Sequence, residues 1–246
     1  MNLSDIPAGT LIGRILRQPL KLIPGNAAMP ILQGRLKGKR WIAGAHTHGC
    51  WLGSYESKKQ KLFESKVKPG DAVFDIGANA GLYTLLASDL VGSIGHVYAF
   101  EPLPRNTHFL REHLRLNRVE NVEVIESAVS ERSGDTYFDH TPGNAMGHFA
   151  AKGRFKVRTV SIDALISEGK VLPPNCMKID VEGGEFLVLS GAKSTLMNYH
   201  PIIFLATHGA QVHEQCCGLL KSFGYQIEGL DGASTAQCDE LIASAT

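Results

Sequence analysis

The sequence lacks an excess of charge of either sign. Its 25 Lys and Arg residues are matched by 24 Asp and Glu residues, so the formal net charge at pH 7 is only +1. Proteins that bind nucleic acid or an anionic membrane surface usually concentrate positive charge, which attracts phosphate groups. The balance gives no support for a nucleic-acid partner, and we expect none.

Long apolar runs and paired cysteines are also absent. A transmembrane helix needs about 20 predominantly apolar residues, and no stretch of the chain is both apolar enough and long enough. Near the N-terminus, Arg14 and Arg17 interrupt the apolar residues, which argues against a secretory signal. The cysteines are odd in number and form no CxxC pair, so we predict a cytoplasmic protein with reduced thiols. They are Cys50, Cys176, Cys216, Cys217 and Cys238.

What the sequence does contain is a regular alternation of apolar runs with helical patterns. Apolar strands that alternate with helices indicate a Rossmann-like α/β fold, with a mostly parallel sheet and helices on both faces. Ligands of such sheets bind at the carboxyl ends of the strands. We predict strands at 71–76, 96–100, 121–125, 176–181, 202–206 and 225–230, and helices at 55–68, 81–91, 104–117, 185–197 and 211–223.

The sequence divides into a main domain and two flanking segments. Residues 1–50 are rich in Gly and Pro, and we expect short strands or turns that pack on the main domain, residues 51–230. Residues 231–246 are interpreted as a C-terminal tail.

Less regular structure is expected inside the main domain. Residues 136–138 and 155–160 are predicted as antiparallel strands around a loop at 139–153. Ser161 is expected to cap a short helix that runs through Ile166.

The sharpest motif follows the strand predicted at 71–76. Gly77, Asn79 and Gly81 form a GxNxG turn, and Asp75 lies two residues before the first glycine. A dinucleotide brings a pyrophosphate, which needs free backbone N–H groups and no nearby negative charge. S-adenosylmethionine instead brings an ammonium and a sulfonium, and Asp75 can accept a hydrogen bond from the amine. The motif favours S-adenosylmethionine, with an NAD-dependent oxidoreductase and a non-catalytic adenosyl-binding module as alternatives.

Two further strand ends carry residues that suit the adenosine part of such a cofactor. Glu101 lies roughly 20 residues beyond the glycine loop, the spacing at which a carboxylate binds ribose hydroxyls. Pro102 follows it, and Asn106, in the first turn of the next helix, is expected to add a polar contact. After the third strand, Ser127 and Ala128 are expected to lie beside the adenine ring.

A cluster of charges marks the end of the fourth strand. Alternation along an extended segment places Lys178, Asp180 and Glu182 on one side. Burying such charges is costly unless they are paired or used. They either form an ion-pair cluster, or Asp180 and Glu182 line the cleft near the methyl group and the acceptor. Two carboxylates can also contribute to a divalent-cation site, but no third ligand is certain, so we predict no metal centre.

His208 follows the fifth strand and is expected to reach the rim of the same cleft. A hydroxyl loses its proton as it attacks a methyl carbon, and a neutral imidazole is a suitable base. We therefore predict His208 as the catalytic base, with an ordinary surface or core histidine as the alternative. His46 and His48 are assigned no role, because no Cys or carboxylate set completes a metal site with them.

In combination, these motifs resemble the FkbM family of S-adenosylmethionine-dependent methyltransferases. The resemblance rests on residues 52–56, 74–84, 99–102 and 178–183 and extends to about residue 230. It implies a class I methyltransferase whose seven-stranded sheet is mostly parallel, with one antiparallel strand near the edge. It also implies O-methylation of a hydroxyl on a sugar, polyketide or other natural product. The expected partner is therefore a small-molecule or glycan acceptor.

The resemblance also assigns roles to individual residues. It implies that Glu56 closes over the cofactor and that Asp180 and Glu182 face the reaction centre. The family often has an acidic residue before the histidine, where this sequence has Ala206 and Thr207. The predicted catalytic residues are thus His208, Asp180 and Glu182, and the predicted cofactor-binding residues are Glu56, Asp75, Gly77, Ala78, Asn79, Gly81, Glu101, Pro102, Asn106, Ser127, Ala128 and Asp180.

Overall fold

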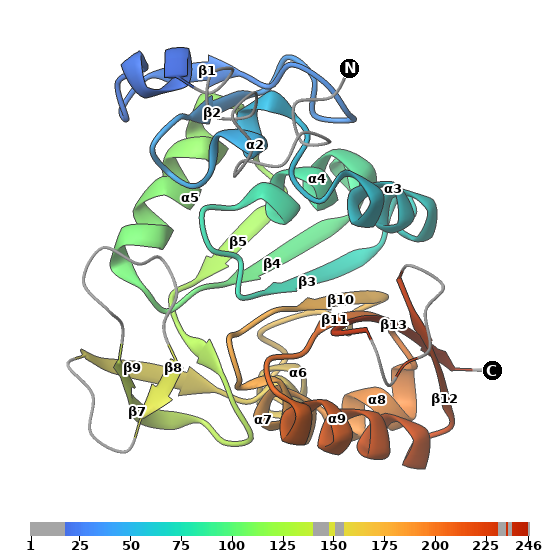
Figure 1. The fold of residues 1–246 in the computed structure, drawn as a ribbon. Coiled ribbons are helices and arrows are strands. Elements are labelled where there is room, and N and C mark those ends of the chain that lie inside the picture. The colour runs from blue at the N-terminus through green and yellow to red at the C-terminus, as the bar shows by residue number, and fades with distance from the viewer. Residues whose placement is uncertain (1–17, 140–147, 151–154, 231–234, 236–237, 246) are drawn as a thin grey trace.

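A central sheet separates two groups of helices, and a smaller sheet lies beside it (Figure 1). The computed structural model describes residues 18–139, 148–150, 155–230, 235 and 238–245. None of the helices in these ranges is long and apolar enough to cross a bilayer. All five cysteines are free thiols, as expected.

The central sheet consists of seven strands. In chain order they are β3 (Ala72–Ile76), β4 (His96–Phe100), β5 (Val122–Ile125), β10 (Cys176–Ile179), β11 (Ile202–Ala206), β12 (Tyr225–Gly229) and β13 (Glu240–Ala245). Their order across the sheet is β12-β13-β11-β10-β3-β4-β5. The strands from β11 to β5 pair in parallel, whereas β13 runs antiparallel to both of its neighbours. The predicted Rossmann-like fold, with one antiparallel strand near the edge, is confirmed.

Helices cover both faces of this sheet (Figure 1). One group consists of α3 (Ser57–Lys66), α4 (Leu82–Val91) and α5 (Pro104–Leu116), and the other of α6 (Ile162–Ser167), α7 (Glu185–Ser190), α8 (Lys193–Tyr199) and α9 (Ala210–Ser222). Successive strand side chains point to opposite faces. Val73 and Val97 therefore pack in the cluster that contains Leu85, and Phe74 and Tyr98 in the one that contains Val188. Burial on both faces explains why the strands are apolar throughout.

Two elements differ from the prediction, and both differences involve Gly191, which lies close to the backbone of Ser130. The helix expected at 185–197 is divided into α7 and α8, and Gly191 separates them. A Cβ on Gly191 would lie 2.1 Å from the Ser130 carbonyl oxygen. Ser161 precedes α6 as expected, but its hydroxyl donates to the Gly191 carbonyl rather than capping the helix. Instead, Asp163 accepts hydrogen bonds from the first backbone N–H groups of α8.

Both ends of the described chain contribute to the fold. The sheet extends past the domain end predicted at residue 230, because β13, placed by sequence in a tail, lies between β11 and β12. At the other end, β1 (Ala28–Pro30) and β2 (Arg40–Ile42) form a hairpin, with a short 3₁₀ helix η2 (Gln18–Leu22) before it and α2 (His48–Leu52) after it. A second 3₁₀ turn, η3 (Gly92–Ile94), follows α4.

A buried histidine ties the N-terminal hairpin to the glycine loop. Trp41 stacks on His113 of α5 with ring centroids 3.9 Å apart. Nε2 of His113 accepts a hydrogen bond from the Ile42 N–H, and Nδ1 donates to the Ala80 carbonyl. Burial lowers the pKa of His113 to about 4, so the ring is neutral near pH 7 and can make both bonds.

The smaller sheet forms beside the carboxyl end of β5. It contains β6 (Ala128–Val129), β9 (Phe155–Val160), β7 (Gly134–Asp139) and β8 (His148–Ala150), in that order. β7 and β9 are antiparallel, which confirms the pairing predicted for residues 136–138 and 155–160. Much of the loop predicted at 139–153 lies outside the described residues.

The placement of β13 generates a stability prediction. Leu241 is fully buried in this strand, whereas Ser244 in the same strand is exposed. Leu241→Ala should lower the free energy of unfolding by about 2–5 kcal/mol, because it leaves a cavity in the core. Ser244→Ala should change it by less than about 0.5 kcal/mol. Denaturant unfolding of both variants measures the difference; equal changes would mean that residues 240–245 do not belong to the core.

Candidate active site

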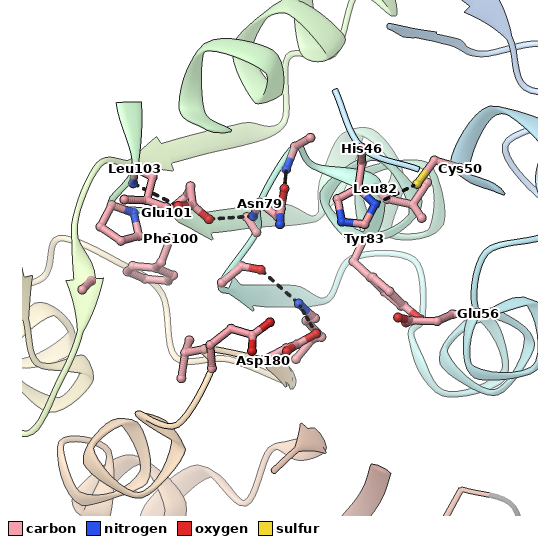
Figure 2. A pocket seen from close by; sticks show the side chains of 18 of the residues that line it. His46, Cys50, Glu56, Asn79, Leu82, Tyr83, Phe100, Glu101, Leu103 and Asp180 are labelled. Carbon is pink, nitrogen blue, oxygen red and sulfur yellow. Dashed lines mark hydrogen bonds and ion pairs between the residues drawn. The ribbon is translucent and has the colours of Figure 1, made fainter. Parts of the chain in front are cut away.

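A cavity of about 450 Å³ lies at the carboxyl ends of the parallel strands. Figure 2 shows side chains from several loops converging on it. Its walls come from the glycine loop after β3, the ends of β4 and β5, the segment after β10, and the N-terminal segment that includes α2. The predicted site residues that line it are Glu56, Gly77, Ala78, Asn79, Glu101, Pro102, Ser127, Ala128, Asp180 and Glu182.

The glycine loop has two positions that require glycine. Gly77 has a φ of +77°, and a Cβ there would lie 1.9 Å from the Asp180 carbonyl oxygen. Gly81 has a φ of +91°, and its Cβ would lie 2.3 Å from Cδ1 of Leu110. Gly77 therefore allows the loop to approach the segment after β10. Gly81 does not line the cavity, and its role is to let α4 pack against α5.

The backbone N–H groups of the loop are all used within the protein. Those of Gly77 and Ala78 donate to the Phe100 carbonyl, and that of Gly81 donates to Ala78. Asn79, at a left-handed φ of +50°, donates its N–H to Glu101 Oε2, and its own side chain accepts from the Ala80 N–H. A pyrophosphate needs free N–H donors, and this loop has none to offer.

Glu101 is a buried carboxylate at the cavity wall. Its Oε2 accepts the Asn79 N–H at 2.8 Å and its Oε1 accepts the Leu103 N–H at 2.9 Å. Burial raises the pKa of Glu101 to about 7, although these hydrogen bonds act in the opposite direction. Asn106, which the sequence placed against the cofactor, is itself buried and bonds to Glu101 instead of lining the cavity. Asn106 therefore holds the Glu101 side chain in position without contacting the cavity.

The position of Asp75 contradicts the contact predicted for it. Asp75 is 1% exposed and does not line the cavity. The register of β3 against β10 sets it opposite Lys178, with Oδ1 3.6 Å from the lysine Nζ. Its Oδ2 accepts a hydrogen bond from the Thr84 hydroxyl at 2.6 Å. Asp75 is therefore a buried counter-ion, and it does not reach a bound amine.

Asp180 is the acid that faces the cavity in place of Asp75. Lys178 donates to the Gly77 carbonyl and lies 3.6 Å from Asp180 Oδ2. Burial opposes the charge on both groups, but their attraction prevails: the pKa of Lys178 is raised and that of Asp180 is lowered. Both the ion-pair cluster and the cleft-lining position considered for these charges are therefore present. The cavity wall carries an ionised carboxylate at this point.

His208 meets the acids after β10 but does not itself line the cavity. Its Nδ1 lies 2.8 Å from Oε1 of Glu185, and its Nε2 lies 3.5 Å from Oε2 of Glu182 and 3.8 Å from Oδ1 of Asp180. The hydrogen bond to Glu185 is the main reason that the pKa of His208 is raised to about 9. The ring is therefore mostly protonated near pH 7, the opposite of the neutral base that was predicted.

Several residues that line the cavity were not predicted from sequence. Trp41 and His46 come from the N-terminal segment, Tyr55 from the motif at 52–56, and Tyr83 from α4. The Tyr83 hydroxyl donates to Glu56 at 2.8 Å, which holds the glutamate at the wall. Tyr83 lies within the motif at 74–84 and could have been found there. Trp41 and His46 had no comparable signal, because their segment carries no periodic pattern.

Comparison with known proteins is consistent with this geometry. The family model "Methyltransferase FkbM domain" matches residues 75–227, more than half of the chain. Hexuronic acid methyltransferase AglP of Haloferax volcanii is 30% identical over 146 residues, which cover 58% of this chain and 59% of AglP. The 31-O-demethyl-FK506 methyltransferase FkbM of Streptomyces tacrolimicus is 28% identical over 162 residues, covering 52% of this chain and 62% of that protein. The chain thus spans less than two thirds of each of these relatives.

Solved structures support the same fold. The FkbM methyltransferase of Methylobacillus flagellatus KT superposes with a TM-score of 0.52 at 17% identity, over 75% of this chain and 50% of that one. A precorrin-6y C5,15-methyltransferase of Geobacter metallireducens gives a TM-score of 0.51 at 15% identity, over 78% and 90%. At such low identity these structures are evidence for the fold alone. The family assignment rests on the match over residues 75–227, which covers more than half of the sequence: the chain belongs to the FkbM family of methyltransferases.

Proposed function

We propose that this protein transfers the methyl group of S-adenosylmethionine to a hydroxyl group of a sugar-containing acceptor. One observation carries the proposal: a single cavity joins the buried Glu101 carboxylate to the ionised Asp180 (Figure 2). The first group suits ribose hydroxyls and the second suits a cation. S-adenosylmethionine carries both features in one molecule.

The adenosine half of the cofactor suits the ends of β4 and β5. Glu101 accepts hydrogen bonds from the Asn79 and Leu103 N–H groups and from the Asn106 side chain, and a carboxylate has about four acceptor positions, so about one remains for a ribose hydroxyl. Phe100, Ala128 and Val129 give the adjoining wall an apolar surface suited to a flat ring. A cavity of about 450 Å³ is within the usual range for small-molecule sites.

The amino-acid half suits the opposite end of the cavity. Asp180 provides an ionised carboxylate, and the Glu56 side chain lies at the same cavity, where it accepts a hydrogen bond from Tyr83. These groups attract an ammonium and a sulfonium and repel phosphate. Since the loop N–H groups are also occupied, the site favours S-adenosylmethionine over NAD for two independent reasons.

The proposed chemistry is a direct displacement. The hydroxyl oxygen attacks the methyl carbon, the bond from carbon to sulfur breaks with its electron pair left on sulfur, and the hydroxyl proton leaves to solvent or a base. The donor is already activated by its positive sulfur, so the protein mainly has to align the reactants at about 3–3.5 Å. The similarity to a hexuronic acid methyltransferase and to FkbM supports a hydroxyl-rich acceptor of small-molecule or glycan type.

Cofactor affinity should depend on pH through Glu101. Its pKa of about 7 means that the carboxylate becomes protonated as the pH falls through neutrality, and it then accepts hydroxyl hydrogen bonds less well. We expect S-adenosylmethionine affinity, measured by titration calorimetry, to fall up to about tenfold from about pH 8 to about pH 6. Glu101→Gln should bind about ten- to a hundredfold more weakly and show a flatter pH profile.

Glu126→Gln is the matched control for this experiment. Glu126 follows the next strand, is exposed, and pairs with Arg111 outside the cavity. Its replacement should leave both the affinity and the pH profile unchanged. Equal profiles for the wild type and Glu101→Gln would remove Glu101 from the cofactor site.

Transfer itself can be tested with a labelled methyl donor and a panel of hydroxylated acceptors. The panel should include hexuronic acid glycosides, neutral glycosides and polyketide alcohols. We expect label in a product that survives mild alkali, because an ether is stable there whereas a methyl ester on a uronic carboxylate is hydrolysed. Gly77→Ala should lose transfer, since its Cβ would overlap the Asp180 carbonyl.

The other outcomes of this assay separate the alternatives. Alkali-labile label would replace O-methylation of a hydroxyl with ester formation. Cofactor binding without transfer to any acceptor would favour a non-catalytic adenosyl-binding module. Binding of a nicotinamide cofactor in place of S-adenosylmethionine would favour an oxidoreductase.

A further inference from the structure

We infer that Asp180, Glu182 and His208 form a binding site for a divalent transition-metal ion at the edge of the cavity. Sequence alone offered two acids and no certain third ligand. The fold supplies the third, because β10 and β11 are neighbours and the loops after them meet. Binding of the ion does not require the cofactor, whereas its role in methyl transfer rests on the proposed function.

The geometry of the three side chains suits a small ion. One ligand atom from each residue lies within 4.8 Å of the other two. Nε2 of His208 is 3.5 Å from the Glu182 carboxylate and 3.8 Å from that of Asp180. Ligands at about 2.0–2.2 Å from a metal lie about 3 Å apart. The side chains are 27–36% exposed, so they have room to close by this small amount.

A buried carboxylate behind His208 gives independent support. Glu185 is 0% exposed, and its Oε1 receives the Nδ1 hydrogen of His208 at 2.8 Å. The Val181 and Gly183 N–H groups donate to the same oxygen and fix its position. Metal-binding histidines usually donate their other ring nitrogen to such a carboxylate, which directs the lone pair at the ion. Here it directs Nε2 toward Asp180 and Glu182, and a bound ion would displace the proton that Nε2 carries in its absence.

The carboxylates around His208 also have too few positive partners. Among the described residues, Glu182 and Glu185 form ion pairs with His208 alone, and Oε2 of Glu185 is buried without a hydrogen-bond partner. Lys178 approaches Asp180 at Oδ2 and is shared with Asp75, so Oδ1 stays directed toward His208. Buried carboxylates without full compensation are costly. A divalent ion between these ligands would supply the missing charge.

The ligand set indicates the kind of ion and its use. Two carboxylates with one imidazole suit Mn²⁺, Fe²⁺ or Zn²⁺ better than Mg²⁺ or Ca²⁺, which prefer oxygen ligands alone. Three protein ligands leave coordination positions free, and Asp180 and Glu182 line the cavity. A hydroxyl of the acceptor bound there would lose its proton to solvent more readily. The resulting alkoxide would then take the methyl group and leave a neutral thioether.

The test uses Mn²⁺ alone as the probe, on protein freed of metal with a chelator. Titration followed by electron paramagnetic resonance should show one bound Mn²⁺ per chain. Glu182→Gln and His208→Asn should each weaken binding at least tenfold, and both side chains are exposed enough for the variants to fold, which their unfolding midpoints check. Asp89→Asn is the matched control, because Asp89 is a partly exposed carboxylate, 25% exposed, that pairs with Arg35 and Lys39 and does not belong to the proposed site. The affinity of the Asp89→Asn variant for Mn²⁺ should equal that of the wild type.

Two results would overturn the inference: no saturable Mn²⁺ binding to the wild type, or equal affinity in the wild type, Glu182→Gln and His208→Asn. Calorimetry with S-adenosylmethionine on the same metal-free samples keeps the two proposals apart. Cofactor binding without Mn²⁺ binding removes the metal site and leaves the proposed function standing. Mn²⁺ binding without cofactor binding supports the metal site and contradicts the proposed function.

Discussion

The site depends above all on the buried ammonium of Lys178. Only 6% of its side chain is exposed, and it lies 3.6 Å from a carboxylate oxygen of Asp75 on one side and of Asp180 on the other. It also donates to the Gly77 carbonyl. Buried charges are tolerated only with partners in good geometry. These contacts therefore hold the end of β3, the glycine loop and the segment after β10 in one arrangement.

That arrangement decides which negative charge the cavity presents. Asp75 acts as a buried counter-ion, whereas Asp180 lines the cavity, with Oδ2 near Lys178 and Oδ1 3.8 Å from Nε2 of His208. Negative charge at the cavity still favours a cationic cofactor, but that charge comes from Asp180 after β10 rather than from Asp75 in β3. The occupied N–H groups of the loop reinforce it, because the backbone has lost its usual attraction for phosphate.

Sequence reasoning succeeded where the determinants are local. Apolar strands, the glycine turn and the position of Glu101 each follow from short-range pattern, and each lies where it was expected. It failed for Asp75 because the partner, Lys178, is 103 residues away, and only strand register brings the two together. β13 was missed because the segment 240–245 is short and contains several small residues, which give only a weak strand pattern. The charge of His208 depends on Glu185, a contact between the loop after β11 and the first residue of α7 that no sequence spacing predicts.

The sheet order also separates the two ends of the proposed reaction. Glu101 and Ser127 follow β4 and β5, on one side of β3, whereas Asp180 and His208 follow β10 and β11, on its other side. The glycine loop after β3 lies between them, and Gly77 is the residue that lets it touch the segment after β10. If the nucleoside occupies the first side, the reactive methyl group points toward the second. Under the proposed function, Asp180 then faces the cationic end of the cofactor, and Glu182, with His208 3.5 Å away, lies toward the acceptor hydroxyl rather than toward the cofactor's ribose.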